Sequence, residues 1–342
     1  MRWFCGAVLL VGALAVSFKA SGSPVAPAQQ VAAAPGPTAT LPFRLLSYNV
    51  HGTPWPLSSG RTQDLRAIAA DLRTKRGSGD QPHIVVLQEA FVGEAKAIGR
   101  EAGYHYVAFG PRADAGSTVQ STAADRQFAS HASFWSGERM GKRVDSGLAL
   151  FSDYPILWVK RVVFPGFACA GWDCLANKGA LAAAVQVPGI AEPLVIVTTH
   201  LNARGAAGVG FDRSNYAFQR QLDELNHFMS TLDGPLLLAG DFNIGTDPVR
   251  EASFSRLIAD RGLSIVAVER RCGHGCHRAV GVGEEQAALL AAAKSMVLSR
   301  SGGPLMPSAL ATFGRTPKGA MMSDHIGLDV GFGLAAVLGG RS

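Results

Sequence analysis

Residues 236–243 read LLLAGDFN, a short apolar run that ends in Gly-Asp-Phe-Asn. Such a run is typical of a buried β-strand that presents polar side chains at its C-terminal end. Because side chains alternate along a strand, Asp241 and Asn243 are predicted to face the same side. A carboxylate and a carboxamide held together can orient a water molecule, a metal ion or a phosphoryl oxygen. Gly240 would let the backbone approach such a ligand closely.

Four other segments place a polar or titratable side chain beside an apolar, strand-like run. They are residues 47–49 (SYN), 87–89 (LQE), 198–200 (TTH) and 323–325 (SDH). A single ending of this kind would be an ordinary turn after a strand. Because the pattern recurs, we expect one site built where several strands end, with Asn49, Glu89, His200 and His325 near Asp241.

Composition indicates a folded chain with a sizeable core. The chain has 342 residues, of which 47% are hydrophobic and 17% charged, and its formal net charge is +6. These values exclude a disordered chain, and the mild positive charge permits anionic partners without requiring them. Length alone suggests about two domains. We expect one, because the polar strand ends extend from Asn49 to His325 and must converge if they share a site.

The N-terminus predicts export. Residues 1–22 combine Arg2, an apolar stretch and a small-residue cleavage site, as a signal peptide does. The apolar stretch is too short to span a membrane comfortably, so an uncleaved anchor is the lesser alternative. Residues 23–40 are rich in Pro and Ala and suit a flexible linker. A secreted or periplasmic protein is therefore expected.

Four cysteines beyond the leader form two close pairs, Cys169 with Cys174 and Cys272 with Cys276. In an exported chain disulfides are the default, and of the three possible connectivities local pairing requires the least rearrangement. The alternative for residues 272–277 (CGHGCH) is a zinc site made of thiolates and imidazoles. An oxidising compartment disfavours that alternative, and the spacing fits no strong zinc pattern.

Several charged residues suggest specific chemistry. Glu89 follows a buried apolar run, and its oxygen ligands would favour Mg²⁺ or a similar hard cation. Asp324 is positioned in the sequence to orient His325 and raise its basicity, as general acid–base catalysis requires. Asp173 and Lys178 could form a mobile ion pair in a loop, with Lys178 contacting a phosphate. A solvated loop pair is the alternative.

Three longer segments carry structural predictions. Residues 216–232 have the apolar spacing of a core-facing helix. Residues 112–141 are irregular and polar, which suggests a long surface loop. The Ala/Leu-rich residues 286–298 predict a buried helix, with an apolar surface that touches membrane as the alternative.

The motifs 47–49, 87–89, 199–200, 240–243 and 323–325 together resemble, in the same order, those of the endonuclease/exonuclease/phosphatase superfamily of the deoxyribonuclease I type. The resemblance covers nearly all of the mature chain. It implies an α/β fold, a four-layer sandwich of two packed, mixed or largely antiparallel sheets flanked by helices. The catalytic domain would span residues 41–333, followed by a short tail at 334–342.

Within that superfamily, three features look like neutral sphingomyelinases. They are residues 146–156 (SGLALFSDYPI), the Asp/Lys spacing in residues 173–179 (DCLANKG), and residues 199–203 followed by 220–225. The resemblance implies hydrolysis of sphingomyelin to ceramide and phosphocholine at a membrane surface. No exposed aromatic hairpin of the kind that some secreted sphingomyelinases insert into lipid is evident in the sequence.

The resemblance also implies roles for the carboxylates and amides. Glu89 would hold a divalent cation, Mg²⁺ or Mn²⁺ or a similar ion, with help from Asn49. Asp241 and Asn243 would position the attacking water and the phosphoryl group. An in-line displacement on a phosphodiester, stabilised by a metal and hydrogen-bond donors, needs no covalent nucleophile.

Histidine and loop residues have implied roles as well. His200 would contact phosphate oxygens, and His325 paired with Asp324 would act as general base or acid. Asp173 and Lys178 would form a regulatory or substrate-facing pair.

Three other functions stay open. A secreted nuclease would use the same scaffold with nucleic acid as substrate, although no dense patch of Arg and Lys with interleaved aromatics is evident. A phosphoinositide phosphatase would prefer a multiply charged headgroup. A non-enzymatic binding module or toxin subunit would have lost Glu89, Asp241 or His325, yet all three are present. No obligate protein partner is indicated.

Overall fold

The computed structural model describes residues 43–54, 58–273, 276–281 and 286–334. These residues belong to one compact unit, Ala39–Ser342. The predicted signal peptide and linker lie outside the described residues, and so do the side chains of Cys272 and Cys276.

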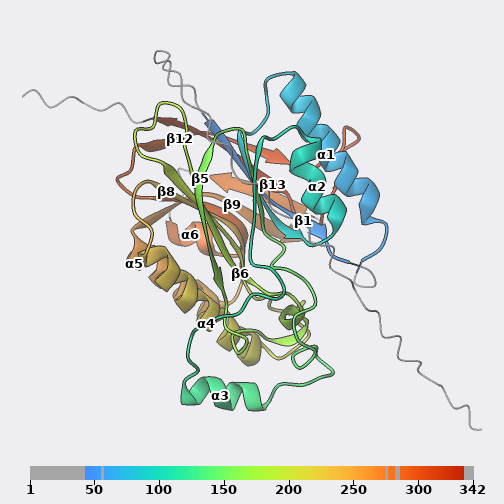
Figure 1. The fold of residues 1–342 in the computed structure, drawn as a ribbon, viewed down its shortest axis with the longest axis vertical. Helices are drawn as coiled ribbons and strands as arrows, with labels where there is room; N and C mark the ends of the chain where they lie inside the picture. Colours follow the sequence, from blue (N-terminus) through green and yellow to red (C-terminus); the bar gives the residue numbers. More distant parts are fainter. Residues whose placement is uncertain (1–42, 55–57, 274–275, 282–285, 335–342) are drawn as a thin grey trace, which may run out of the picture. The chain divides into compact units, whose positions relative to one another are not determined.

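Helices are interspersed among the strands of the described chain (Figure 1). In chain order they are β1 (Phe43–Gly52), α1 (Arg61–Gly77), β2 (Ile84–Ala90), α2 (Gly93–Glu101), β3 (Tyr106–Phe109), α3 (Ala123–Ser130), β4 (Ala149–Ser152), β5 (Ile156–Val163), the 3₁₀ helix η1 (Gly171–Leu175), β6 (Gly179–Val185), β7 (Leu194–His200), α4 (Phe211–Ser230), β8 (Leu236–Gly245), α5 (Pro248–Arg261), β9 (Leu263–Gly273), β10 (Cys276–Gly281), α6 (Gln286–Leu290), β11 (Ala293–Arg300), β12 (Leu305–Phe313) and β13 (Gly327–Leu334).

The strands form two sheets. A six-stranded sheet has the order β12-β13-β1-β2-β4-β3, and a seven-stranded sheet has the order β10-β9-β11-β8-β7-β6-β5. Most neighbours are antiparallel, but β1 pairs with β2 in parallel and so does β7 with β8. Each sheet therefore contains one parallel pair, whose two C-terminal ends lie at the same edge.

The two sheets pack face to face, and β8 shows how its sequence makes this possible. Leu237 and Ala239 belong to a buried cluster that contains residues of both sheets, such as Leu45 of β1. Leu236 and Leu238 point the other way, into a cluster with α4 and α5. A strand covered on both faces reads as a continuous apolar run, as this one does.

Helices cover the two outer faces of the sandwich. Leu65, Ile68 and Leu72 of α1 pack with Ile98 of α2 on the six-stranded sheet. On the seven-stranded sheet, α4 and α5 contribute a second apolar layer that includes Phe218. Figure 1 shows α1 and α2 on the side opposite α4 and α5. The predicted α/β four-layer sandwich is confirmed.

Two of the predicted elements need correction. Residues 286–298 do not form one helix, since α6 ends at Leu290 and β11 begins at Ala293, between β8 and β9. Burial on both faces of β11 removes the alternation that would have marked a strand. The predicted loop at 112–141 contains α3, whose first turn is capped reciprocally by Thr122 and Asp125. None of the helices in the described part of the chain is long and apolar enough to cross a membrane.

The structure gives a reason for glycine at position 240 that the sequence did not reveal. It pairs in register with Thr199 of β7, and a Cβ at position 240 would lie 2.1 Å from the Thr199 carbonyl oxygen. The backbone that approaches Gly240 closely is thus that of the neighbouring strand.

Replacing Gly240 by Ala is expected to lower the free energy of unfolding by roughly 1–3 kcal/mol, because the two central strands must separate. Urea unfolding of the purified protein measures the change. Gly93→Ala is the matched control, since a Cβ at the start of α2 meets nothing within 4 Å. Equal stability of the two variants would contradict the argument.

Candidate active site

The parallel pairs of the two sheets bring their polar ends together. Asn49 and Glu89 lie near the ends of β1 and β2, and His200, the last residue of β7, pairs in register with Asp241 in the second half of β8. The Asn49 Nδ2 group donates to Glu89 Oε1 at 2.9 Å and to Asp241 Oδ2 at 3.0 Å. One buried amide therefore joins a carboxylate from each sheet.

Two histidines approach the same Asp241 carboxylate. His325 Nε2 lies 3.4 Å from Asp241 Oδ2, and His200 Nε2 lies 3.8 Å from it. Both imidazoles are buried. Asp241 Oδ1 accepts the backbone N–H of Asn243 at 3.1 Å, while the Asn243 side chain donates to the Leu201 carbonyl at 3.1 Å. The site predicted from separate strand ends is thus a single cluster around Asp241.

The partner of His325 differs from the predicted one. His325 Nδ1 lies 2.7 Å from Oε2 of Glu269, a fully buried residue of β9. Asp324, which the sequence pairs with His325, has its carboxylate half exposed and 3.5 Å from His51 Nδ1. Their different burial explains the correction, since the imidazole turns into the core while its chain neighbour turns to solvent. Glu269 is therefore the carboxylate that orients His325.

Glu269 is itself held rigidly. Its Oε2 accepts the Ser295 hydroxyl at 2.7 Å, and its Oε1 accepts the Ile326 N–H at 3.1 Å. A signal for it does exist in the sequence, because Glu269 ends the apolar run 265–268 (IVAV) as Glu89 ends its own run. Without the register between β9 and the segment before β13, that signal could not be tied to His325.

Burial and neighbouring charges shift the pKa values of His325 and His200 in opposite directions. Burial opposes the charged form of His325, but Asp241 and then Glu269 outweigh it and raise the pKa of His325 to about 9. Burial, followed by the nearby charge of Lys178, lowers the pKa of His200 below its usual value. Burial also disfavours the Asp241 anion, yet His325 and His200 together hold the pKa of Asp241 well below its usual range. At neutral pH the site thus contains an imidazolium, a neutral imidazole and a carboxylate.

Backbone strain is concentrated at the same place. Among the described non-glycine residues, only four have positive φ: His51 (49°), Glu89 (56°), Asn243 (51°) and Ala292 (63°). The left-handed region is unfavourable for residues with a Cβ, and persists where surrounding contacts enforce it. Three of the four, His51, Glu89 and Asn243, lie beside Asn49 or Asp241. Their backbone conformation fixes the direction of the Glu89 and Asn243 side chains.

The predicted Asp173–Lys178 pair is formed, with Lys178 buried and Asp173 partly buried. Lys178 Nζ donates to Asp173 Oδ2 and to the Leu201 carbonyl, each at 2.9 Å. Asp173 also accepts the Ala203 N–H. Burial raises the Asp173 pKa, but Lys178 and then His200 outweigh it and lower the value. The pair therefore holds the segment that follows His200.

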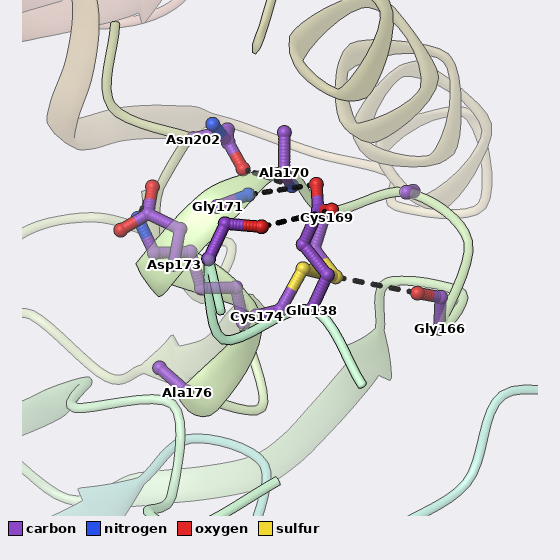
Figure 2. Close-up of a disulfide and its surroundings, with 12 residues drawn as sticks. Glu138, Gly166, Cys169, Ala170, Gly171, Asp173, Cys174, Ala176 and Asn202 are labelled. Carbon is purple, nitrogen blue, oxygen red and sulfur yellow. Dashed lines mark hydrogen bonds and ion pairs between the residues drawn. A yellow bond between two sulfur atoms is a disulfide. The ribbon is translucent and has the colours of Figure 1, made fainter. Parts of the chain in front are cut away.

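A disulfide supports the loop that carries Asp173. Cys169 and Cys174 are bonded, as local pairing predicts, and Figure 2 shows Asp173 directly beside the bond. In the same view Ala170 N donates to the Asn202 side chain and Gly171 N donates to Glu138, both at 3.0 Å. The other predicted pair and the zinc alternative concern side chains outside the described residues.

Arg250 is a further buried residue that the sequence did not single out. Its fully buried guanidinium donates to four backbone carbonyl groups and one side-chain amide, those of Asn202, Ala203, Ser214, Asn243 and Asn215. Burial lowers its pKa to about 10, against the opposing effect of Asp247. Arg250 thereby joins the loop that follows β7 and His200 to the end of β8 at Asn243 and to the start of α4.

The oxygen-rich donor set fits a hard divalent cation. Glu89 and Asp241 are carboxylates joined through Asn49, and among the described residues no Lys or Arg forms an ion pair with Glu89. No group of three or more His, Cys, Asp or Glu side chains in the described part of the chain is arranged to hold a metal. Glu89, with help from Asn49, would offer such a cation oxygen donors, which suits Mg²⁺ with retained waters.

Sequence comparison places most of the chain in one family. Residues 46–325 match the model of the endonuclease/exonuclease/phosphatase family, which confirms the superfamily resemblance. No curated protein matches the chain in sequence.

Solved structures with the same fold include enzymes of different kinds. Sphingomyelinase C from Streptomyces griseocarneus is 20% identical, with a TM-score of 0.56, and covers 85% of this chain and 99% of its own. A beta toxin mutant from Staphylococcus aureus, determined with bound magnesium ions, is 15% identical with a TM-score of 0.57 (85% and 99% covered). D. rerio TDP2, complexed with a single strand DNA product, is 15% identical with a TM-score of 0.53 (85% and 98% covered). At these identities the similarity shows the shared fold.

Replacing Arg250 by Met is expected to lower the free energy of unfolding by about 3 kcal/mol or more, since several buried carbonyl groups lose their donor. Chemical denaturation measures the loss. Arg256→Met is the control, because Arg256 is exposed on the same helix. If the two variants unfold alike, Arg250 does not stabilise these loops.

The raised pKa of His325 predicts how stability depends on pH in EDTA. Its protonated form stabilises the fold fully below the ordinary pKa of 6.5, and this contribution is lost as pH rises through about 9. The loss amounts to roughly 3 kcal/mol at most. Burial lowers the pKa of Lys142 to about 8, which acts in the opposite direction above that pH.

The measurement is therefore a difference between the wild type and His325→Gln. Urea unfolding at pH 6, 7, 8 and 9 should show a decline in the wild type that is absent or smaller in the variant. Parallel profiles would mean that His325 does not gain its proton affinity from the folded structure.

Proposed function

The chain belongs to the endonuclease/exonuclease/phosphatase family, and we propose that it is a secreted, divalent-cation-dependent phosphodiesterase that cleaves sphingomyelin to ceramide and phosphocholine. Hydrolysis of a phosphodiester is the general chemistry of the family's nuclease and phospholipase members. The observation that carries the proposal is the cluster in which Asn49 joins Glu89 to Asp241, with the His325–Glu269 pair against the same Asp241.

The cluster supplies the groups that an in-line displacement needs. The Asp241 carboxylate, kept ionised by its two histidines, accepts a hydrogen bond from the attacking water. The water oxygen gives a proton to Asp241 and forms the new bond to phosphorus, while the bond from phosphorus to the ceramide oxygen breaks and that oxygen takes a proton from His325. Asp241 then returns its proton to His325 Nε2, which lies 3.4 Å away. Asn243, whose backbone is fixed to Asp241, orients the phosphoryl group.

His325 has the geometry and charge of a general acid. Glu269 accepts from Nδ1, so the N–H at Nε2 faces the reaction centre. Because the pKa is raised to about 9, that proton is present at neutral pH and can pass to the departing ceramide oxygen. His200, which stays neutral, donates a hydrogen bond to a phosphate oxygen.

A divalent cation at Glu89, with Asn49 orienting that carboxylate, would neutralise charge on the phosphoryl oxygens. Lys178 adds a fixed positive charge nearby, since it lowers the pKa of His200. Mg²⁺ is the proposed ion because the donors are oxygens, and a relative of the same fold holds magnesium.

The choice of lipid rests on motif similarity and on the kinds of proteins that share the fold. The Asp173–Lys178 pair and residues 146–156 are the features similar to neutral sphingomyelinases, and sphingomyelinase C is among the structural relatives. The Cys169–Cys174 disulfide supports an oxidising, extracytoplasmic location.

The test uses sphingomyelin vesicles and, in parallel, phosphoinositide vesicles and supercoiled plasmid, each with Mg²⁺ or EDTA. Phosphocholine release that requires Mg²⁺, with plasmid intact, is expected. His325→Gln and Glu89→Gln should each lower the rate by roughly 10²–10⁴, the usual share of one catalytic group. His227→Gln, on the exposed face of α4, is the control and should retain full activity.

Other outcomes would redirect the proposal. Plasmid nicking without lipid turnover would identify a nuclease on the same residues, and a relative of this fold is known with a DNA product. Turnover of phosphoinositides alone would identify a phosphatase. Full activity of His325→Gln on sphingomyelin would refute the assigned mechanism.

A further inference from the structure

Four aromatic side chains remain exposed near the site. Their exposed fractions are 51% for Phe134, 84% for Trp135, 41% for Trp172 and 56% for Phe211. Single exposed apolar residues are ordinary on a protein surface, whereas a group of large aromatic ones marks a contact surface. We refer to these four residues as the aromatic surface.

The members of the aromatic surface come from three segments that meet at one hollow. Trp135 and Trp172 both line it, together with the glycine-bounded turn 208–210 that leads into Phe211. Phe134 contacts Trp135 edge to face, with ring centroids 5.7 Å apart. The three segments that carry the aromatic groups therefore meet in space, although they are spread between positions 134 and 211 of the sequence.

Polar contacts hold this surface in place. Glu138 accepts from Arg213 Nε at 2.6 Å, from Gly171 N at 3.0 Å and from Ser133 N at 2.8 Å. The Arg213 guanidinium also lies 4.1 Å from the centroid of the Phe128 ring. One carboxylate thus links the segment with Trp135, the segment with Trp172 and helix α4.

Helix α3 is anchored to α4. Asp125 is fully buried and accepts from Arg220 Nε at 2.9 Å and from the Tyr216 hydroxyl at 2.8 Å. Figure 1 shows α3 on the same side of the molecule as α4. Rigid aromatic residues lose little conformational freedom on binding, so a surface of this kind is preorganised for contact.

The aromatic surface is continuous with the active site. Trp172 precedes Asp173, whose carboxylate binds Lys178 and the backbone after His200. The Trp172 N–H donates to the Ala207 carbonyl at 2.9 Å, in that same backbone segment. A surface that docks on the aromatic groups would accordingly lie next to the residues assigned to phosphate chemistry.

Charge around the aromatic surface selects the partner. Within residues 126–143 the exposed charged side chains are those of Arg126, Arg139 and Arg143, whereas Lys142 is partly buried and the one carboxylate, Glu138, is paired with Arg213. Tryptophan prefers the boundary between headgroups and acyl chains, and arginine and lysine bind the phosphates above it. The segment that carries Phe134 and Trp135 is thus mainly basic, although an exposed Asp212 adjoins Phe211. Aromatic side chains on such a segment match a phospholipid bilayer.

We propose that the aromatic surface is the membrane-docking surface of the protein, with Phe134 and Trp135 entering the headgroup region of a phospholipid bilayer. The proposal deepens the sphingomyelinase function proposed above. It rests on that function only in that the membrane presents the substrate to the active site. Docking itself requires no catalysis, so binding and turnover can be tested apart.

Binding is measured with the full chain carrying His325→Gln, so that vesicles stay intact. Co-sedimentation with sphingomyelin/phosphatidylcholine vesicles compares this protein with the same protein carrying Phe134→Ala and Trp135→Ala. Losing two inserted aromatic side chains should weaken vesicle binding roughly 10-fold or more. Met306→Ala is the matched control, since Met306 is 55% exposed on β12 of the other sheet and should leave binding unchanged.

Activity separates docking from chemistry. In the otherwise wild-type protein, Phe134→Ala with Trp135→Ala should lower turnover of vesicle sphingomyelin while leaving turnover of a water-soluble phosphodiester unchanged. Vesicle binding that depends on Trp135 but yields no phosphocholine would retain the docking surface and refute the sphingomyelinase assignment.

Three results would overturn the docking proposal. Unchanged vesicle binding by the double variant is the first. The second is a variant that loses affinity for single-stranded DNA and not for vesicles, because base stacking would then explain the exposed rings. The third is a concentration-dependent dimer that the double variant abolishes, since a second copy of the chain would then cover the surface.

Discussion

The two hydrogen bonds donated by the Asn49 amide are the interaction on which the site depends. They join the ends of two sheets whose contact elsewhere is mainly apolar, with few other polar links such as the hydrogen bond from Gln88 to Thr198. Apolar packing sets the distance between the sheets but not the relative position of their edges. The amide supplies that direction, and the two carboxylates remain close because one donor group lies between them.

Topology makes this bridge possible. A parallel pair in each sheet ends at the same edge, so four strand ends deliver four polar residues without any long loop. The groups that shift the pKa values of the two histidines come from other elements. Glu269 lies on β9 of the seven-stranded sheet, and Lys178 follows a disulfide-supported loop. The site thus combines a rigid frame with partners that set the protonation of each histidine.

The sequence predicts the residues at strand ends and fails where partners are distant. Asp241, Glu89 and Asn49 follow apolar runs, and local patterns suffice to identify them. Glu269 lies 56 positions before His325, so only strand register could pair them. The sequence predicts that Asp324 pairs with His325 because the two are adjacent in the chain, but adjacency along a chain does not mean that two side chains meet. The sequence predicts the residues of β11 as part of a helix, because a strand that is apolar on both faces shows no alternation of apolar and polar residues.

The positive φ angles of Glu89 and Asn243 have a consequence for the evolution of the protein. Each such residue disfavours the fold by an amount of order 1 kcal/mol that glycine would relieve. Selection for thermal robustness alone would therefore tend to replace these side chains and erase the site. Their presence in a left-handed backbone means that the fold gives up some stability at the positions where its polar groups must point.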